Sequence, residues 1–96
     1  MNSFREKVYN TVKKIPKGRV ATYLAVARKI GNPLAVRAVG NALGKNRSKE
    51  VPCHRVVRSN LSVGGYVWGN KRKIQILRKE GVIISNGMVN KKFLWR

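Results

Sequence analysis

The one cysteine of the chain, Cys53, is followed directly by its one histidine, His54. A cysteine attacks electrophiles as the thiolate, and a nearby imidazole can accept the thiol proton directly or through a water molecule. The pair therefore predicts nucleophilic chemistry at the Cys53 sulfur. A structural interpretation stays open at this point: a buried cysteine that packs as a small hydrophobic side chain, beside a histidine that contacts phosphate.

The acidic residues are few, and their positions indicate which one could orient the histidine. A histidine base works best when a carboxylate holds its other ring nitrogen, and the candidates are Glu6, Glu50 and Glu80. Glu6 fits a helix capping box with Ser3, and Glu50 falls in a basic loop. Glu80 ends an amphipathic stretch, where a carboxylate is unfavourable because that end of a helix is negative. An acid in an unfavourable place suggests a specific partner, so Glu80 is the candidate to orient His54, while the structural interpretation of the pair stays open.

Cysteine and histidine are too few for a closed metal centre or an internal disulfide. A structural zinc ion usually takes four ligands, and one cysteine permits no intramolecular disulfide. The sequence also contains no cofactor-binding motif, so we expect no metal and no cofactor. A single cysteine suits a reducing interior.

The charge of the chain is strongly positive. Lysine and arginine total 22 against 3 acidic residues, which gives a formal net charge of +19. Such a field attracts polyanions and favours nucleic acid or an anionic surface as the partner. Composition alone favours a ribosomal-type or chromatin-type protein without chemistry. A membrane is disfavoured, because no segment approaches the ~20 apolar residues of a spanning helix.

Three short helices are expected in the first half of the chain. Apolar residues at helical spacing predict a first helix over 4–15, and a second runs from a Thr22 cap to about Ile30. Asn32-Pro33 form an N-cap and first-turn pair for a third helix, 34–43. Two helices joined by a tight Gly-Asn-Pro turn predict a helix-turn-helix, whose second helix usually enters a DNA groove.

The second half of the chain alternates apolar and glycine-rich segments. Cys53 interrupts a short apolar stretch, 51–57, and a glycine-rich loop with two aromatic residues follows at 64–69. Helical spacing resumes over 70–79, and Asn86-Gly87 between apolar residues is a strong hairpin signal. We therefore predict one domain over residues 1–96, mainly α with small β, of winged helix-turn-helix type.

Pro-Cys-His-Arg-Val at 52–56 resembles the active-site signature of the O6-alkylguanine-DNA alkyltransferases, the methylated-DNA–protein-cysteine methyltransferases. The resemblance runs from about Phe4 to Val82. Its further blocks, in family order, are Lys17-Gly18, Thr22-Tyr23, Gly31-Asn32-Pro33, Arg37-Ala38-Val39-Gly40, Asn46, Gly64-Gly65-Tyr66 and Glu80-Gly81-Val82. It implies the winged helix-turn-helix of the DNA-binding and catalytic domain, in a short form without the N-terminal domain of larger members.

The resemblance also assigns the chemistry. Cys53 would irreversibly accept a methyl or alkyl group from O6-alkylguanine in DNA, once per molecule. His54 would activate it through a water molecule and would itself be oriented by Glu80. Tyr23 would rotate the target nucleotide and donate a proton toward the departing guanine, and Asn46 would be a hinge between the recognition helix and the active-site loop.

Contacts with double-stranded DNA are implied as well, and in this family they are made through the minor groove. Flipping the target base out of the duplex costs a few kcal/mol. Arg37, on the recognition helix, would fill the gap left in the base stack, while Asn32 and Ser59 would help to hold the DNA. From the residues alone, a plain phosphate contact is the favoured interpretation of Arg37.

The pocket for the base would be walled by Tyr66, Val67 and Trp68 and supported by Lys73. Some members carry glycine where Trp68 stands, so an indole there predicts a pocket that accepts methylguanine well and benzylguanine poorly. The competing interpretation is that Trp68 points outward and leaves the pocket unaffected.

Two departures from the family pattern matter. Arg47 stands where a proline usually follows the hinge asparagine, in a segment that looks short, which bears on the hinge geometry. Residues 86–95 resemble the tail of the alkyltransferase-like proteins, which defines an alternative function. Those proteins bind lesions without catalysis and recruit other repair factors, and another residue, often tryptophan, replaces their cysteine. Because Cys53 is present, we expect an active transferase. We also expect a monomer, which would be cytoplasmic and nucleoid-associated in a prokaryote or nuclear in a eukaryote.

Overall fold

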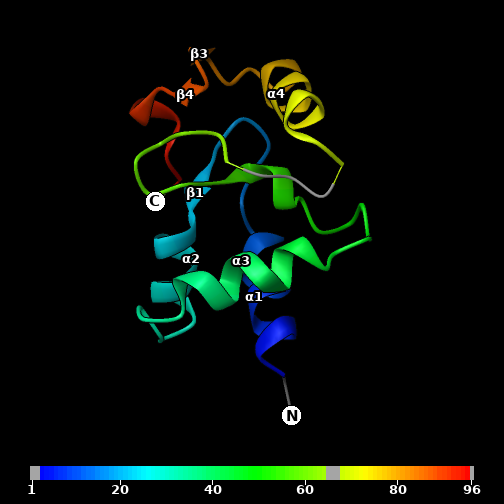
Figure 1. Ribbon diagram of the computed structural model, residues 1–96, viewed down its shortest axis with the longest axis vertical. Helices are drawn as coiled ribbons and strands as arrows, with labels where there is room; N and C mark the ends of the chain where they lie inside the picture. Colours follow the sequence, from blue (N-terminus) through cyan, green and yellow to red (C-terminus); the bar gives the residue numbers. More distant parts are fainter. Residues whose placement is uncertain (1–2, 65–67, 96) are drawn as a thin grey trace.

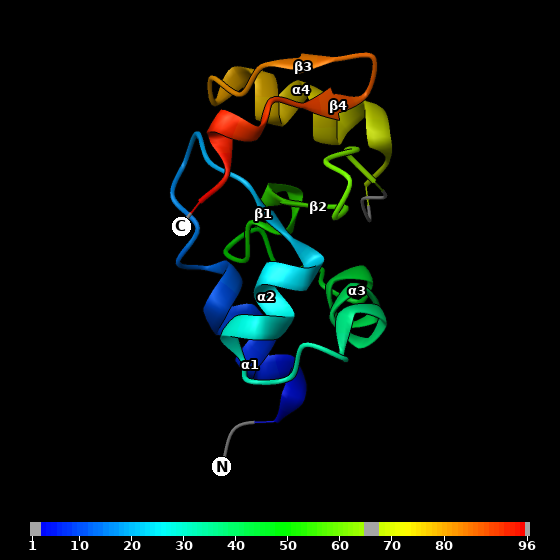
Figure 2. The same ribbon diagram turned by 90° about the vertical axis from the view of Figure 1, so that its left-hand side faces the viewer.

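The computed structural model describes residues 3–64 and 68–95, and it has two tiers joined by a short pair of strands. Helices α1 (Phe4–Val12), α2 (Tyr23–Lys29) and α3 (Val36–Gly44) form one tier. Helix α4 (Asn70–Lys79) and the hairpin β3 (Ile84–Ser85)–β4 (Met88–Val89) form the other. Figures 1 and 2 show the strands β1 and β2 between these tiers. The predicted class, mainly α with small β, is confirmed.

The strands β1 (Ala21–Thr22) and β2 (Val56–Val57) are parallel, with Ala21 opposite Val56 and Thr22 opposite Val57. Successive side chains of a strand point to opposite faces. Val56 accordingly packs into the hydrophobic cluster of the first tier, and Val57 into the cluster of the second. The strand pair thus lies between two separate hydrophobic cores.

Helix α1 begins as predicted and ends earlier than predicted. The Ser3 side chain accepts a hydrogen bond from the Glu6 N–H at 3.2 Å, which confirms the cap. The helix stops at Val12 and not at Ile15, because the residue before a proline is driven out of the helical region. Ile15 is nevertheless only 1% exposed and belongs to the first core.

The turn between α2 and α3 corrects the predicted start of the third helix. Thr22 caps α2 as expected, accepting from the Ala25 N–H at 3.0 Å. Asn32 does not cap α3: its N–H bonds to the Ala27 carbonyl at 2.9 Å and so closes the end of α2. Helix α3 therefore starts at Val36 and not at Leu34, and its cap position, Ala35, offers no side-chain hydrogen bond.

The hairpin and the tail complete the second tier. Asn86 and Gly87 have φ of 53° and 73°, the left-handed pair that a two-residue hairpin turn requires, so this prediction is confirmed. After β4 a short 3-10 turn, η2 (Lys91–Phe93), leads the chain back, and the Trp95 N–H donates to the Val20 carbonyl at 2.7 Å. Within the described residues no helix combines the length and apolar character needed to span a bilayer.

Candidate active site

Cys53 lies in the 3-10 turn η1 (Cys53–Arg55), immediately before β2. The pairing of β2 with β1 fixes this turn against the first tier. The cysteine is 6% exposed and packs with the first hydrophobic core. The thiol is therefore held at the boundary between the two tiers.

Asn46 is placed against the cysteine sulfur. This side chain, 2% exposed, lies just after α3, and its Nδ2 is 3.5 Å from the Cys53 Sγ. The same nitrogen donates to the carbonyls of Ser48, at 3.0 Å, and Val51, at 3.3 Å. A donor aimed at sulfur favours the thiolate over the thiol. The sequence predicted a hinge residue here, and the contact with the sulfur itself was not foreseen.

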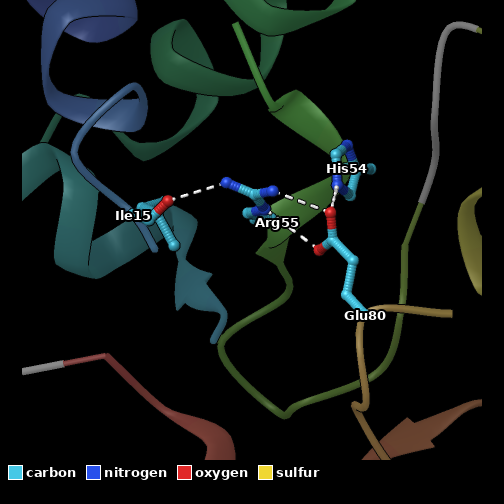
Figure 3. Close-up of polar contacts among 4 residues, drawn as sticks. All are labelled: Ile15, His54, Arg55 and Glu80. Atoms are coloured by element: carbon cyan, nitrogen blue, oxygen red, sulfur yellow. Dashed lines mark hydrogen bonds and ion pairs between the residues drawn. The ribbon is translucent and has the colours of Figure 1, made fainter. Parts of the chain in front are cut away.

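His54 and Glu80 are brought together across the two tiers. Nε2 of His54 lies 3.1 Å from Oε2 of Glu80, which is the C-cap residue of α4 (Figure 3). Burial lowers the pKa of His54 below its ordinary value, although the hydrogen bond and charge of Glu80 oppose that shift. The imidazole is consequently neutral near pH 7, which is the state a base requires.

Arg55 is a site residue that the sequence argument missed. Its Nε and Nη2 donate to the two oxygens of Glu80 at 3.0 and 2.7 Å, and its Nη1 donates to the Ile15 carbonyl at 2.9 Å (Figure 3). Burial tends to raise the pKa of Glu80, but the hydrogen bonds from Arg55 and His54 outweigh it and leave the pKa below its ordinary value. A signal was available: an arginine within an apolar stretch needs an acidic partner, and the chain has few acids.

Tyr23 and Lys73 also lie close to the cysteine. Tyr23 opens α2 directly after β1, and burial followed by the negative charge of Cys53 raises its pKa. Lys73, on α4, is 0% exposed and donates from Nζ to the Val56 carbonyl at 2.7 Å. Burial lowers the pKa of Lys73 to about 8, while Cys53 acts in the opposite direction.

The other predicted DNA-contacting residues are exposed on the surface. Arg37 is exposed on the first turn of α3, Asn32 is exposed in the turn before it, and Ser59 is exposed in the turn after β2. The predicted wall residues Tyr66 and Val67 lie outside the described residues.

Trp68 lines a cavity of about 380 Å³ beside His54, and its side chain is 37% exposed. The other lining residues are Lys49, Val51, Arg72 and Ile76. The indole is therefore a wall of a cavity next to the candidate site, although an exposed fraction remains.

In the described part of the chain, no three His, Cys, Asp or Glu residues are grouped so that they could hold a metal ion.

Sequence comparison finds a matching family model and similar proteins of known name. A family model described as the DNA-binding domain of 6-O-methylguanine DNA methyltransferase matches residues 3–82. A methylated-DNA–protein-cysteine methyltransferase of Saccharomyces cerevisiae is 46% identical over 78 residues, which are 80% of this chain and 42% of the yeast protein. The Escherichia coli bifunctional transcriptional activator/DNA repair enzyme Ada is 43% identical over 79 residues, or 81% of this chain and 22% of that protein. The chain thus spans less than half the length of these curated relatives.

Solved structures resemble the fold closely. S. pombe Atl1, solved with damaged DNA containing O6-carboxymethylguanine, superposes with a TM-score of 0.87 at 31% identity, covering 100% of this chain and 99% of that one. Mycobacterium tuberculosis OGT, solved with DNA, gives a TM-score of 0.80 at 38% identity, covering 84% and 50% of the two chains.

Proposed function

The chain belongs to the family of the 6-O-methylguanine DNA methyltransferases, and from that premise we propose that it transfers an alkyl group from O6-alkylguanine in duplex DNA to Cys53. The observation that carries the proposal is the His54–Glu80 contact of 3.1 Å beside the single, buried cysteine. A neutral imidazole anchored to a carboxylate is the arrangement that activates a thiol.

The proposed reaction is an in-line displacement at the alkyl carbon. Because Nε2 of His54 donates to Glu80, Nδ1 carries the lone pair that accepts the thiol proton, directly or through water. The Cys53 sulfur then forms a carbon–sulfur bond while the bond from that carbon to guanine O6 breaks. The electron pair leaves with the guanine, which regains a proton, and Tyr23 is the nearby group proposed to donate it. The product is a thioether, so each molecule reacts once.

Two groups near the sulfur support the thiolate in this scheme. The Asn46 amide lies 3.5 Å from Sγ, and Lys73 places a buried cation in the field of Cys53. Both lower the free energy of the anion relative to the neutral thiol.

Access to the target atom requires the base to leave the duplex, which costs a few kcal/mol. We assign Arg37, exposed at the start of α3, to the gap that the flipped base leaves, with Asn32 and Ser59 on the flanking backbone. The partner is double-stranded DNA, bound by the helix-turn-helix from the minor groove. The compartment is that of the chromosome, the cytoplasm of a prokaryote or the nucleus of a eukaryote.

Intact-mass measurement after mixing the protein with duplex DNA containing O6-methylguanine tests the proposal. The mass should rise by one methyl group, and the peptide that contains Cys53 should carry it. Cys53→Ala should remove the gain while DNA binding persists with its steep salt dependence. An unchanged wild-type mass would contradict transfer.

A second candidate function is lesion binding without catalysis. It is favoured by the superposition with S. pombe Atl1 over nearly the full length of both chains. Under this alternative the wild-type mass stays unchanged while the protein still prefers methylated over unmodified duplex DNA.

A further inference from the structure

Arg58 is the first residue after β2, at the end of the strand pair that lies between the tiers. The register pairs Thr22 with Val57, so the residues that follow them, Tyr23 and Arg58, leave the carboxyl ends of two parallel strands side by side. Neighbouring strands lie about 4.8 Å apart. The arginine and the tyrosine therefore start from the same edge of the candidate site.

Both the backbone and the side chain of Arg58 are held in place. Its N–H donates to the Ser62 carbonyl at 3.0 Å, and its carbonyl accepts from the Leu61 N–H at 2.8 Å. Its side chain lies along Gly64, because a Cβ added at that glycine would be 3.2 Å from the arginine Cγ and 3.4 Å from Nε. The φ of Gly64 is 75°, which also favours glycine. This glycine thus leaves the space that the stem of the arginine occupies.

The guanidinium at the end of that stem acts on its surroundings through its charge. Arg58 is exposed, and in the part of the chain that the structure describes no hydrogen bond or ion pair engages its guanidinium. The donors of Arg55, by contrast, are taken up by Glu80 and the Ile15 carbonyl. An arginine is not deprotonated in proteins, so Arg58 is a permanent positive charge.

Tyr23 is a group that this charge reaches. Burial and then the negative charge of Cys53 raise the pKa of the phenol, and the charge of Arg58 opposes them. Lys73 of α4 is likewise in the field of both Cys53 and Arg58. The tyrosine ring lies beside α3, 3.9 Å from a Cβ built at Gly40, and among the described residues no hydrogen bond engages its hydroxyl. The phenol is therefore available to a substrate, and Arg58 is the cation that favours its ionised form.

We propose that Arg58 is a positioning residue for alkyl transfer, which stabilises the phenolate that Tyr23 becomes when it gives its proton to the departing guanine. The inference rests on the proposed function. As the Cys53 sulfur bonds to the alkyl carbon, the bond from that carbon to O6 breaks, and the phenol proton neutralises the guanine. The phenolate regains a proton from water, which balances the thiol proton that His54 releases. Without the arginine, a buried phenol beside an anionic sulfur would be a poor acid.

Single-turnover rates at saturating methylated duplex DNA give the first test, because saturation removes any loss of DNA affinity from the comparison. Arg58→Gln should transfer roughly three- to tenfold more slowly, since one pKa unit changes acidity tenfold and the rate by part of that. Arg58→Lys keeps the charge and should restore most of the rate. The matched control is Arg28→Gln, which removes an exposed arginine from the last turn of α2 and should keep the wild-type rate.

A double-mutant cycle asks whether the arginine acts through the phenol. Tyr23→Phe keeps the ring and removes the acid, so adding Arg58→Gln to it should slow transfer no further. An equal loss in the wild-type and Tyr23→Phe backgrounds would show that Arg58 acts on another group, such as a DNA phosphate. That result overturns the inference and leaves the proposed function intact.

Titration of the phenol without DNA tests the same link independently of activity. Fluorine NMR of protein labelled with fluorotyrosine follows each ring, and the signal missing in Tyr23→Phe identifies Tyr23. Its pKa should be higher in Arg58→Gln than in the wild type and unchanged in Arg28→Gln. Equal pKa values in the wild type and Arg58→Gln overturn the inference whatever the rates. An unchanged wild-type mass on methylated DNA rejects the proposed function, and the inference falls with it even if the titration shows the shift.

Discussion

The two tiers of the molecule contribute different halves of the candidate site. The first tier holds the proposed nucleophile: Cys53 packs in its core, and Asn46 reaches the sulfur from the end of α3. The second tier supplies charge, as Glu80 and the buried Lys73 both come from α4. Neither tier alone contains all the groups that are proposed to activate the thiol. The contacts that cross between the tiers are therefore as important to the proposed chemistry as the cysteine itself.

The largest expected effect comes from removing the carboxylate at this junction. In Glu80→Gln the imidazole loses a negative partner, so the pKa of His54 falls further and the imidazole becomes a weaker proton acceptor. Alkyl transfer near pH 7 should slow on the order of a hundredfold, and its pH–rate profile should shift. Single-turnover kinetics across pH measure this, with DNA binding as the control. A profile that does not move would return Glu80 to a structural role at the end of α4.

The free energy of unfolding at acidic pH should also depend on the Glu80 carboxylate. The folded-state pKa of Glu80 lies below its ordinary value of 4.5, so its stabilising contribution is complete above that pH and is lost as the pH falls below it. Wild type should therefore lose stability more steeply below this pH than Glu80→Gln.

Arg55 is expected to matter for stability more than for chemistry. It joins Glu80 of the second tier to the Ile15 carbonyl of the first, through partly buried hydrogen bonds. Arg55→Ala should cost about 2 kcal/mol of unfolding free energy, below the value for a fully buried pair because some exposure remains. Urea denaturation measures it. Arg55→Lys keeps the charge without the two-pronged geometry and should recover only part of the loss; full recovery would show that geometry is unimportant.

Lys73 should give a smaller effect, visible in the free energy of unfolding at alkaline pH. Its pKa is about 8 in the folded protein against 10.5 ordinarily, so between those values the unfolded chain binds more protons than the folded one. The free energy of unfolding should accordingly rise with pH across that window. Lys73→Met should lack the rise, and its transfer rate should fall because a cation near Cys53 is gone. An identical alkaline slope in both proteins would contradict the assignment.

Substituting Arg37 should leave the junction between the tiers intact and should affect only the reaction with DNA. It is exposed on α3, so Arg37→Ala should change unfolding free energy by less than about 0.5 kcal/mol. Its transfer rate should fall on duplex DNA more than on a single strand, because a side chain that fills a base stack matters only where a stack exists. Equal losses on both substrates would indicate a phosphate contact.

The sequence was informative where chemistry or backbone geometry is local. Asn86-Gly87 specified the hairpin turn, and the scarcity of acids made Glu80 a candidate partner of His54, which the family resemblance then favoured, across 26 positions. It was less informative where a residue serves the preceding element: Asn32 closes α2 and does not open α3. The Asn46–Cys53 contact depends on how a whole loop folds back, which no local pattern encodes. The roles of Arg37, Asn32 and Ser59 stay predictions, since the protein alone does not contain the surface they would contact.

Thr22 ends β1 and also caps α2, and that double use bears on which insertions and deletions the chain can accept. One residue inserted between Thr22 and Tyr23 would rotate α2 by about 100° relative to the strand, because a helix has 3.6 residues per turn. The tyrosine would then face away from the cysteine. In the segment between Asn46 and Cys53, one amide nitrogen bonds to the carbonyls of Ser48 and Val51 as well as to the sulfur, so an inserted residue there would pull these contacts apart. Both segments should therefore tolerate substitutions better than changes of length.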